Sequence, residues 1–450
     1  AKKYKFDEIN ATDLVSDLTV SAKQKVEILK TLYRKAEVII LDEPTAVLTP
    51  QETVQLFEQL KGFKELGHTI IFISHKLNEV KEISDRITVI RSGETKGTYD
   101  TKDVSIEKLT ELIIGHSLES SYDSLRKQAK NNDTILSVEN LSFEVGGVKK
   151  VDNVNFAIEE GKTLGVVGES GCGKSTTGRT ILRLLEATDG EIIFEGKNIR
   201  EYSKAEMKKL REEMQIIFQD PFASLNPRMT VSEIIAEPLI IHKKCKNKQE
   251  LNDRVKELMD TVGLSQRLVN TYPHELDGGR RQRIGIARAL ALNPKFIVCD
   301  EPVSALDVSI QAQVLNLMKD LQEKLGLTYM FITHDLSVVK YFSNDIAVMY
   351  LGELVEKAPS KDLFKNPIHP YTKALLSAIP TINIRKKMER IKLEGEITSP
   401  INPGIGCRFA KRCIYAEEIC SKESPKLEKV GEAHFFACHR AKELGFVNEK

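Results

Sequence analysis

One glycine-rich segment has the residue types and the spacing needed to hold phosphate groups. It follows the apolar run 164–167, precedes a helix-like stretch at 177–185, and consists of Gly168, Glu169, Ser170, Gly171, Cys172, Gly173, Lys174, Ser175 and Thr176. Strand, loop and helix in this order are the context that the motif G-x-x-x-x-G-K-[ST] requires. Its glycines let backbone N–H groups turn toward phosphate oxygens, and the helix N-terminus adds a favourable dipole. We expect Lys174 to reach the terminal phosphates and the Ser175 hydroxyl to bind Mg²⁺.

Two adjacent acids end a second apolar run. Residues 296–299 are apolar, and Asp300 and Glu301 follow them. In P-loop NTPases the first acid of such a pair helps to hold Mg²⁺. Glu301 would then orient or deprotonate the attacking water. Because an isolated acid pair at a strand end is more often a solvated edge, this interpretation depends on Lys174 in the same chain.

Three further features follow the same order along the chain. Gln219 ends the apolar segment 216–218, a glycine turn includes Asp277, Gly278 and Gly279, and His334 follows the apolar segment 328–333. A Gln or His in such a place would, by itself, more often be a satisfied core or surface group. The complete order of phosphate loop, Gln219, glycine turn, acid pair and His334 resembles an ATP-binding cassette (ABC) domain.

That resemblance implies a fold and a division of roles. The fold is α/β, a P-loop NTPase with a RecA-like core and a helical subdomain. Gln219 would help to bind Mg²⁺, His334 would act as the switch, and residues 276–280 would be the signature that completes the ATP site of a facing domain. ATP and Mg²⁺ are the implied ligands. Phe143 could stack on adenine, but a single aromatic near a strand end is also a common core residue.

Composition and charge restrict the class of protein. The chain has 450 residues, of which 41% are hydrophobic and 29% charged, and this is ordinary for a globular protein of two or three domains. Because 66 basic residues face 65 acidic ones, no overall basic field attracts nucleic acid. No apolar run approaches the roughly 20 residues that cross a bilayer. We therefore expect a cytoplasmic protein with no nucleic-acid partner.

Part of the chain is repeated. Residues 41–48 resemble 299–306, residues 69–75 resemble 328–334, and residues 92–94 resemble 351–353, always at a spacing of 258 to 259. Only the second copy has room for a phosphate loop. The expected organisation is a partial ABC ATPase domain at 1–118, a linker at 119–133, a complete domain at 134–359 and an extension at 360–450.

The first copy resembles a different branch of the family from the second. Residues 13–34, 41–52 and 73–76 are similar to the later half of the first ATPase domain of ribose- and nucleoside-type sugar importers. Its signature has Ser21 where that branch has Gly. Without a phosphate loop, Asp42, Glu43 and His75 are expected to be scaffold or vestige rather than a working ATP site.

The second copy resembles the ATPase subunits of oligopeptide and dipeptide importers. The similarity rests on residues 219–228, 310–313, 366–380 and 399–403. It implies a second ABC ATPase subunit, two membrane-spanning permease subunits and an extracytoplasmic peptide-binding protein as partners. The chain would then lie peripherally at the cytoplasmic face of the cell membrane. A non-transport ABC ATPase, or a fused remnant with impaired hydrolysis, is kept as an alternative.

The signature departs from the family pattern. Where the family has Leu-Ser-Gly-Gly-Gln, this chain has Leu276, Asp277, Gly278, Gly279 and Arg280. A serine hydroxyl can donate to a γ-phosphate, whereas an aspartate carboxylate only accepts hydrogen bonds and repels that phosphate. The hypothesis is that the ATP site completed by this signature is impaired, while the site at Lys174 stays active with a partner's intact signature.

Four of the seven cysteines lie near the end of the chain: Cys407, Cys413, Cys420 and Cys438. Four thiolates can hold Zn²⁺ or an iron–sulfur cluster, although the tight C-x2-C pairs typical of zinc modules are missing. The peptide-importer resemblance implies a [4Fe-4S] cluster here, with zinc or uncoordinated thiols as alternatives. Cys172 and Cys299 are expected to fill small gaps beside the nucleotide.

Overall fold

A computed structural model describes most of the chain and divides it into two compact units, largely residues 1–126 and largely residues 127–450. The described residues are 36–45, 50–74, 76–91, 93–106, 133–378, 405–431 and 433–447, with residues 23, 26, 27, 30, 31, 33, 108, 109, 112 and 391. Residues 119–132 of the expected linker at 119–133, the signature position Ser21, and His75, which corresponds to His334, lie outside them. In the described part, no helix is long and apolar enough to cross a membrane.

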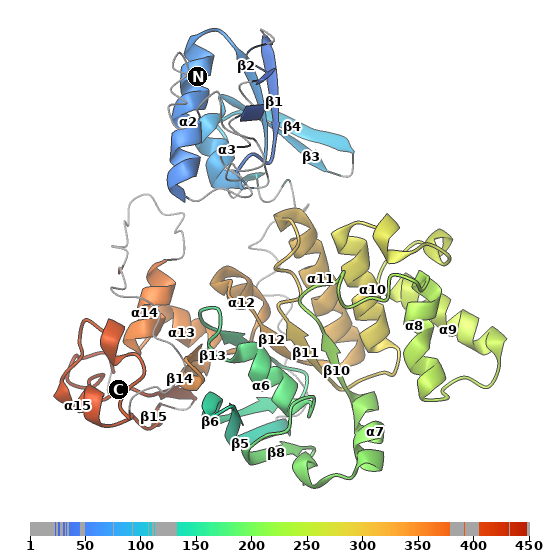
Figure 1. The fold of residues 1–450 in the computed structure, drawn as a ribbon, viewed down its shortest axis with the longest axis vertical. Helices are drawn as coiled ribbons and strands as arrows, with labels where there is room; N and C mark the ends of the chain where they lie inside the picture. Colours follow the sequence, from blue (N-terminus) through green and yellow to red (C-terminus); the bar gives the residue numbers. More distant parts are fainter. Residues whose placement is uncertain are drawn as a thin grey trace. The chain divides into compact units, whose positions relative to one another are not determined.

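A mainly parallel sheet forms the centre of the second unit (Figure 1). Its strands, in spatial order, are β10 (Met214–Ile217), β11 (Phe296–Asp300), β12 (Thr328–Ile332), β7 (Thr163–Val167), β13 (Asp345–Tyr350), β14 (Glu353–Pro359), β16 (His434–Phe436) and β15 (Glu428–Val430). All five residues of β7, β11 and β12 are buried, as expected of strands covered on both faces. The central strand β7 pairs in parallel with β12 and with β13.

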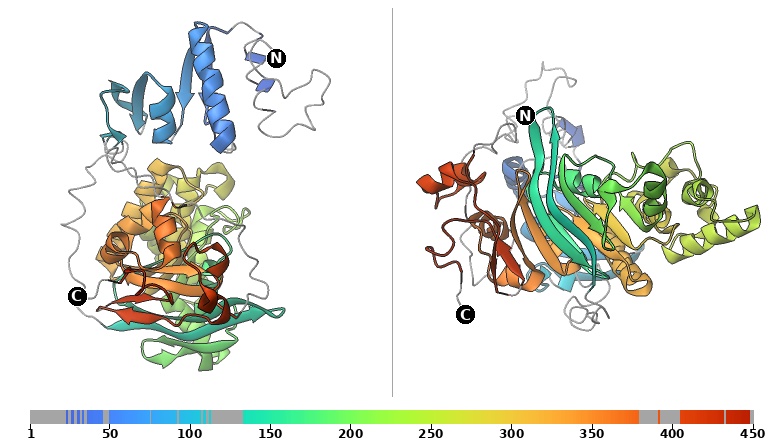
Figure 2. Two further views of the ribbon diagram at one scale, coloured as in Figure 1. Left: turned by 90° about the vertical axis from the view of Figure 1, so that its left-hand side faces the viewer. Right: turned by 90° about the horizontal axis from the view of Figure 1, so that it is seen from below.

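An antiparallel sheet covers one side of this unit and includes a long strand pair (Figure 2). Its strands are β5 (Thr134–Val145), β6 (Val148–Glu159), β8 (Asp189–Phe194) and β9 (Lys197–Asn198). Together with β7, β11, β12 and the helix α6 (Lys174–Ile181), it encloses one continuous apolar core. The helix that follows the phosphate loop is therefore fixed between two sheets.

The helices α8, α9 and α10 pack against one another beside the parallel sheet (Figure 1). The helices of the second unit other than α6 are α7 (Lys204–Glu213), α8 (Val231–Ile241), α9 (Lys248–Thr261), α10 (Gly278–Leu290), α11 (Val308–Leu325), α12 (Leu336–Phe342), α13 (Ser360–Lys365), α14 (Pro370–Ser377) and α15 (Glu418–Lys422). Capping boxes start α7 at Ser203 and α8 at Thr230. In each, the hydroxyl accepts from the backbone N–H three residues on, and the glutamate at that position accepts from the N-cap backbone N–H.

The C-terminal extension adds two strands to the end of the parallel sheet. Strand β14 pairs antiparallel with β16, which pairs with β15. The Glu356 carboxylate is fully buried, accepts hydrogen bonds from the backbone N–H of Ile368 and His369 at 2.8 and 2.9 Å, and lies 2.7 Å from Nε2 of His434. These contacts compensate the buried charge and join α14 to the sheet.

The first unit contains β1 (Val38–Asp42), α2 (Pro50–Glu65), β2 (Thr69–Ile73), α3 (Leu77–Ile83), β3 (Arg86–Arg91) and β4 (Glu94–Asp100). Strands β1 and β2 are parallel, and β3 and β4 form a separate antiparallel pair. Residues of β1, β2 and α2, among them Ile39, Leu60 and Phe63, form a small core on one side of β1 and β2.

The two units share their strand register at the spacing seen in the sequence. Val38 pairs with Thr69 in the first unit, and Phe296 pairs with Thr328 in the second. The β3–β4 pair has its irregularity after Val89, and β13–β14 has one after Val348. Glu43 and Glu301 both have a positive φ, at 44° and 46°.

Candidate nucleotide site

The turn from β7 into α6 brings the glycine-rich segment close to the neighbouring backbone. Gly173 has φ +100°, and a Cβ there would lie 2.6 Å from the carbonyl oxygen of Lys150. A Cβ on Gly168 would lie 2.2 Å from the carbonyl oxygen of Met349. Both positions therefore require glycine for steric reasons, which explains both glycines of the motif.

Lys174 is folded back into its own loop. Its Nζ donates to the carbonyl oxygens of Gly168 and Glu169 at 2.8 and 2.9 Å and lies 3.6 Å from the sulfur of Cys172. The residue is almost completely buried, so these carbonyls replace the water that its ammonium group loses. Burial raises the pKa of Cys172, so its sulfur next to Lys174 is a neutral thiol. An entering phosphate would replace these weaker neutral acceptors.

The first acid of the pair meets the phosphate loop directly. Asp300 ends β11 with its side chain buried, and its Oδ1 accepts from the Ser175 hydroxyl at 2.5 Å. Its second oxygen lies 3.4 Å from Arg179 of α6. A hydroxyl and a carboxylate on adjacent elements are hard oxygen ligands of the kind that Mg²⁺ accepts. The structure thus brings together two residues that are 125 positions apart in the sequence.

Glu301 lies between the two other residues that the sequence singles out. Its Oε2 accepts from Nε2 of Gln219 at 3.0 Å, and its Oε1 lies 3.2 Å from Nδ1 of His334. The backbone of Glu301 has φ +46°, which is unfavourable for a residue with a side chain. The backbone N–H of Glu301 donates to the Ile332 carbonyl at 2.9 Å, which holds this conformation in place. The arrangement presents one carboxylate between an amide and an imidazole.

The altered signature forms the start of α10. Asp277 is the N-cap: its Oδ1 accepts from the Arg280 backbone N–H at 2.8 Å, and its Oδ2 lies 3.3 Å from Nε of Arg280. Aspartate and serine are about equally good N-caps, so the substitution keeps the helix start. Both side chains of the ion pair are half exposed, so the pair contributes little free energy. A Cβ on Gly279 would lie 2.6 Å from Ile310.

Phe143 and two cysteines lie in core positions. Phe143 is partly buried against the apolar core that α6 shares with both sheets, as the core interpretation of this residue requires. Cys172 belongs to the same core, and Cys299 to the core below α8, α9 and α10. Burial raises the pKa of Cys299 well above its ordinary value. Both cysteines therefore act as small apolar residues; Cys172 does so within the phosphate loop, whereas Cys299 packs in the other core and not, as expected, beside the loop.

The four C-terminal cysteines line one cavity. Cys407, Cys413, Cys420 and Cys438 all face it, although they span 32 positions of the sequence. Burial raises the pKa of Cys407 to about 12 and also raises the pKa of Cys413 and Cys438. As they stand, no three His, Cys, Asp or Glu residues in the described ranges are arranged to hold a metal ion. Cys407, Cys413 and Cys438 therefore face the cavity as neutral thiols.

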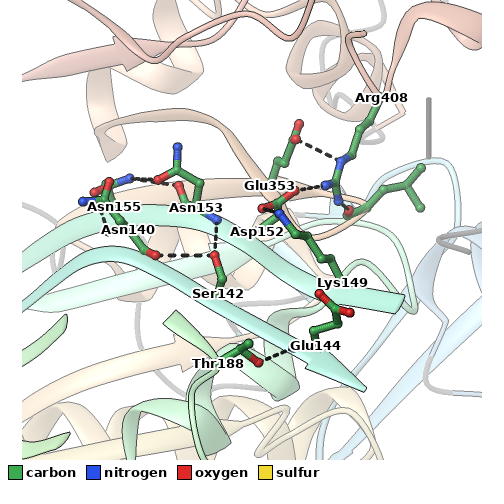
Figure 3. Close-up of polar contacts among 11 residues, drawn as sticks. Asn140, Ser142, Glu144, Lys149, Asp152, Asn153, Asn155, Thr188, Glu353 and Arg408 are labelled. Atoms are coloured by element: carbon green, nitrogen blue, oxygen red, sulfur yellow. Dashed lines mark hydrogen bonds and ion pairs between the residues drawn. The ribbon is translucent and has the colours of Figure 1, made fainter. Parts of the chain in front are cut away.

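Contacts from the C-terminal extension to the phosphate loop were not predicted from the sequence. Arg412 binds the Glu169 carboxylate, and the Tyr371 hydroxyl accepts from the Glu169 backbone N–H at 2.9 Å. Arg408 lies between the carboxylates of Asp152 and Glu353 (Figure 3). A signal was available, since each arginine directly adjoins a cysteine of the cluster, at 407 and 413.

The chain is similar to known protein families and to individual known proteins. The ABC transporter family matches residues 151–304, and the C-terminal region of oligopeptide/dipeptide transporters matches residues 355–420. The oligopeptide transport ATP-binding protein AppF of Bacillus subtilis (strain 168) is 50% identical over 69% of this chain and 98% of its own length. OppF of the same organism is 65% identical over 52% of this chain and 77% of its own length. The solved cbiO1 from Clostridium perfringens has a TM-score of 0.48 at 29% identity, covering 52% of this chain and 91% of that chain.

The fold, the site and these matches define a class. The chain belongs to the ABC transporter ATP-binding proteins, within the oligopeptide and dipeptide transport group of that family. It is accordingly an ATPase of the α/β P-loop NTPase fold, which confirms the predicted fold class, and ATP and Mg²⁺ are the ligands of its family.

Proposed function

We propose that the second unit binds MgATP at the phosphate loop and hydrolyses it with Glu301. The observation that carries this proposal is the meeting of Ser175 with Asp300, next to a Glu301 carboxylate held between Gln219 and His334. Gly168 to Thr176 would surround the phosphates with backbone N–H groups, and Lys174 would exchange its two carbonyl acceptors for phosphate oxygens. Mg²⁺ bound through Ser175, Asp300 and Gln219 would neutralise charge that develops on the phosphates.

Hydrolysis then depends on a proton acceptor beside the attacking water. Glu301 is placed to orient or deprotonate that water, and His334 and Gln219 fix its two oxygens. The facing signature, Asp277, Gly278 and Gly279 in this chain, would complete the site of a second cassette. Because Asp277 brings a negative charge to that position, we propose that the site completed by this signature is the weaker of two.

The energy of hydrolysis is proposed to drive import of oligopeptides or dipeptides. Support comes from the matched C-terminal region and from relatives named as oligopeptide and dipeptide transport proteins. Two permease subunits, a second ATPase subunit and an extracytoplasmic peptide-binding protein would be the partners, with this chain at the cytoplasmic face of the membrane. The names of these relatives favour transport over the alternative of a cassette that acts on nucleic acid.

Matched variants in the two units test the catalytic assignment. We expect Lys174→Ala to weaken binding of a fluorescent ATP analogue at least tenfold, because it removes the cation that meets the phosphates. Glu301→Gln should keep binding but lower hydrolysis about 100-fold or more, measured with an intact-signature partner subunit. Glu43→Gln, at the equivalent position of the first unit, is the control and should change neither.

Asp277→Ser should raise hydrolysis about twofold if the second site is impaired. Full binding by the Lys174→Ala chain would refute the site.

The first unit is proposed to be an incomplete ABC domain at 1–118, followed by a linker at 119–133, the complete domain at 134–359 and the extension at 360–450. Shared register, a shared irregularity and the paired φ values of Glu43 and Glu301 support this division. Its origin in a sugar-importer type of domain rests on the sequence resemblance alone.

The cysteine cavity is proposed to take a [4Fe-4S] cluster, with zinc as the second candidate. Four thiols around one cavity supply the right donor set. Since burial holds the pKa of Cys407 near 12, binding must release protons, and uptake should strengthen as the pH rises from 6 to 8.5. Anaerobic reconstitution followed by absorbance near 400 nm tests this, with zinc uptake measured in parallel. Equal uptake by a chain with Cys407→Ser and Cys420→Ser would contradict the site.

A further inference from the structure

Glu169 directly follows the first glycine of the phosphate-loop motif, and the C-terminal extension holds it at two points. Its carboxylate receives two parallel hydrogen bonds from Arg412, 2.7 Å from NH1 to Oε2 and 3.1 Å from NH2 to Oε1. Its backbone N–H donates to the Tyr371 hydroxyl at 2.9 Å. Its carbonyl oxygen is one of the two acceptors of Lys174. A single residue thus connects the extension to the lysine that faces the phosphates.

Arg412 depends on this contact. The side chain is 8% exposed, and in the described part of the chain nothing accepts a hydrogen bond from its buried Nε. Apart from Glu169, the Tyr350 hydroxyl accepts from NH1 at 3.4 Å, and the Tyr350 ring lies below the guanidinium at 6.0 Å. The Glu169 hydrogen bonds raise the pKa of Arg412, so it carries its charge at every physiological pH. A buried bidentate pair of this kind fixes position as well as charge.

Packing of three aromatic rings makes the region around Arg412 rigid. Tyr350, Tyr371 and Phe409 have ring centroids 4.7 to 5.4 Å apart and share one apolar core with Val167, the residue before the loop. The rings come from β13, from α14 and from the turn before Arg412. Aromatic contacts at these distances favour a defined arrangement.

Arg408 contacts the turn between β13 and β14, which is itself hydrogen-bonded to the loop. It donates to the Leu351 carbonyl and to Asp152, and its Nε lies 2.9 Å from Glu353 (Figure 3). The next residue after Leu351 is Gly352, whose N–H donates to the Cys172 carbonyl of the phosphate loop at 2.9 Å. Both arginines therefore act on the loop from one seven-residue segment, 407–413.

We propose that Arg412 is a positioning residue of the ATP site, which sets the conformation of the phosphate loop through Glu169. The inference rests on the proposed nucleotide site, since it assigns a support to that site. Without the guanidinium, the Glu169 carboxylate is released and only the Tyr371 hydroxyl still holds the residue, so its carbonyl is a less firmly fixed acceptor for Lys174. The loop then has to be ordered by the nucleotide itself, so the cost falls on nucleotide affinity more than on the hydrolytic step.

Titration of the full-length chain with a fluorescent ATP analogue tests this role. Arg412→Gln should raise the nucleotide Kd about tenfold, and Arg412→Lys, which keeps the charge but not the fork, should raise it less. Glu169→Gln should reproduce the Arg412→Gln effect, and the double variant should be no worse than either single one, because both remove the same contact. The control is Arg254→Gln, which removes a half-buried pair with Glu257 in α9 and should leave Kd unchanged.

Hydrolysis with a partner subunit separates positioning from general destabilisation. We expect KM for ATP to rise with Kd while kcat stays within about twofold. The melting temperature of each variant reports whether its folding is affected. A wild-type Kd in Arg412→Gln, or additive losses in the double variant, overturns the proposal. If Lys174→Ala abolishes binding in the same assay, such a result refutes only the positioning role. If Lys174→Ala still binds, the nucleotide site itself is wrong.

Discussion

One face of the paired strands is buried in the second unit of this molecule, and the same register positions are exposed in the first. In the second unit, Phe296, Val298, Met330 and Ile332 are at most 1% exposed within β11 and β12. In the first unit, the residues at the same register positions, Val38, Ile40, Ile71 and Ile73, are 47% to 63% exposed. The opposite face is buried in both, as Ile39 and Ile297 show at 1% each. This face is therefore covered in the second unit and exposed among the described residues of the first.

In the second unit, the partner of this face is β7 with the elements that accompany it. In the second unit β7 pairs with both β12 and β13, and α6 and the antiparallel sheet cover the face. In the described part of the first unit, β2 and β3 belong to separate two-stranded sheets with no strand between them. Because β7 also leads into the phosphate loop, the strand that closes the sheet is the one that starts the nucleotide site.

Matched truncations give the largest expected contrast between the units. Ile332→Ala removes a fully buried side chain and should destabilise the second unit by about 3 to 4 kcal/mol. Ile73→Ala, at the equivalent position, removes a side chain that is already 47% exposed and should cost less than about 1 kcal/mol. Hydrogen exchange of peptides from β12 and β2 in the intact chain reports each unit separately. Equal losses in the two peptides would mean that the open face is covered in solution.

The difference between the units also shows what the sequence can predict. The phosphate loop and the pairing of Ser175 with Asp300 follow from local motifs, because their spacing and flanking apolar runs are specific. The incomplete repeat predicted exposed apolar surface in the first unit, but it did not indicate which residues, such as Ile40, are exposed, because that depends on how β1 and β2 are covered. Arg412 was missed because its contact with Glu169 joins residues 243 positions apart, and its position next to Cys413 does not indicate that partner. Phe143 was ambiguous, because an aromatic residue on a strand serves a core and a ligand equally well.

The C-terminal extension of the second unit contains a buried histidine, His369, which should give this unit an acid-sensitive step. Burial lowers the pKa of His369 from 6.5 to about 4, while the Glu356 charge opposes this shift. The unfolded chain therefore binds a proton first as the pH falls. The stabilisation from neutral His369 is complete above pH 6.5 and is lost progressively between pH 6.5 and 4.

Between pH 7.5 and 4.5 this histidine should account for about 2 to 3 kcal/mol of lost unfolding free energy in the second unit. His369→Gln keeps an acceptor for the Tyr371 backbone N–H, which now donates to Nδ1 at 3.1 Å, but cannot take up a proton. Denaturant unfolding at both pH values, followed by exchange of the α14 peptide, measures the difference. We expect the variant to lose less stability on acidification than the wild type. If the variant loses as much stability on acidification as the wild type, then His369 is protonated without global unfolding. In that case α14 opens locally at a smaller cost than the buried geometry implies.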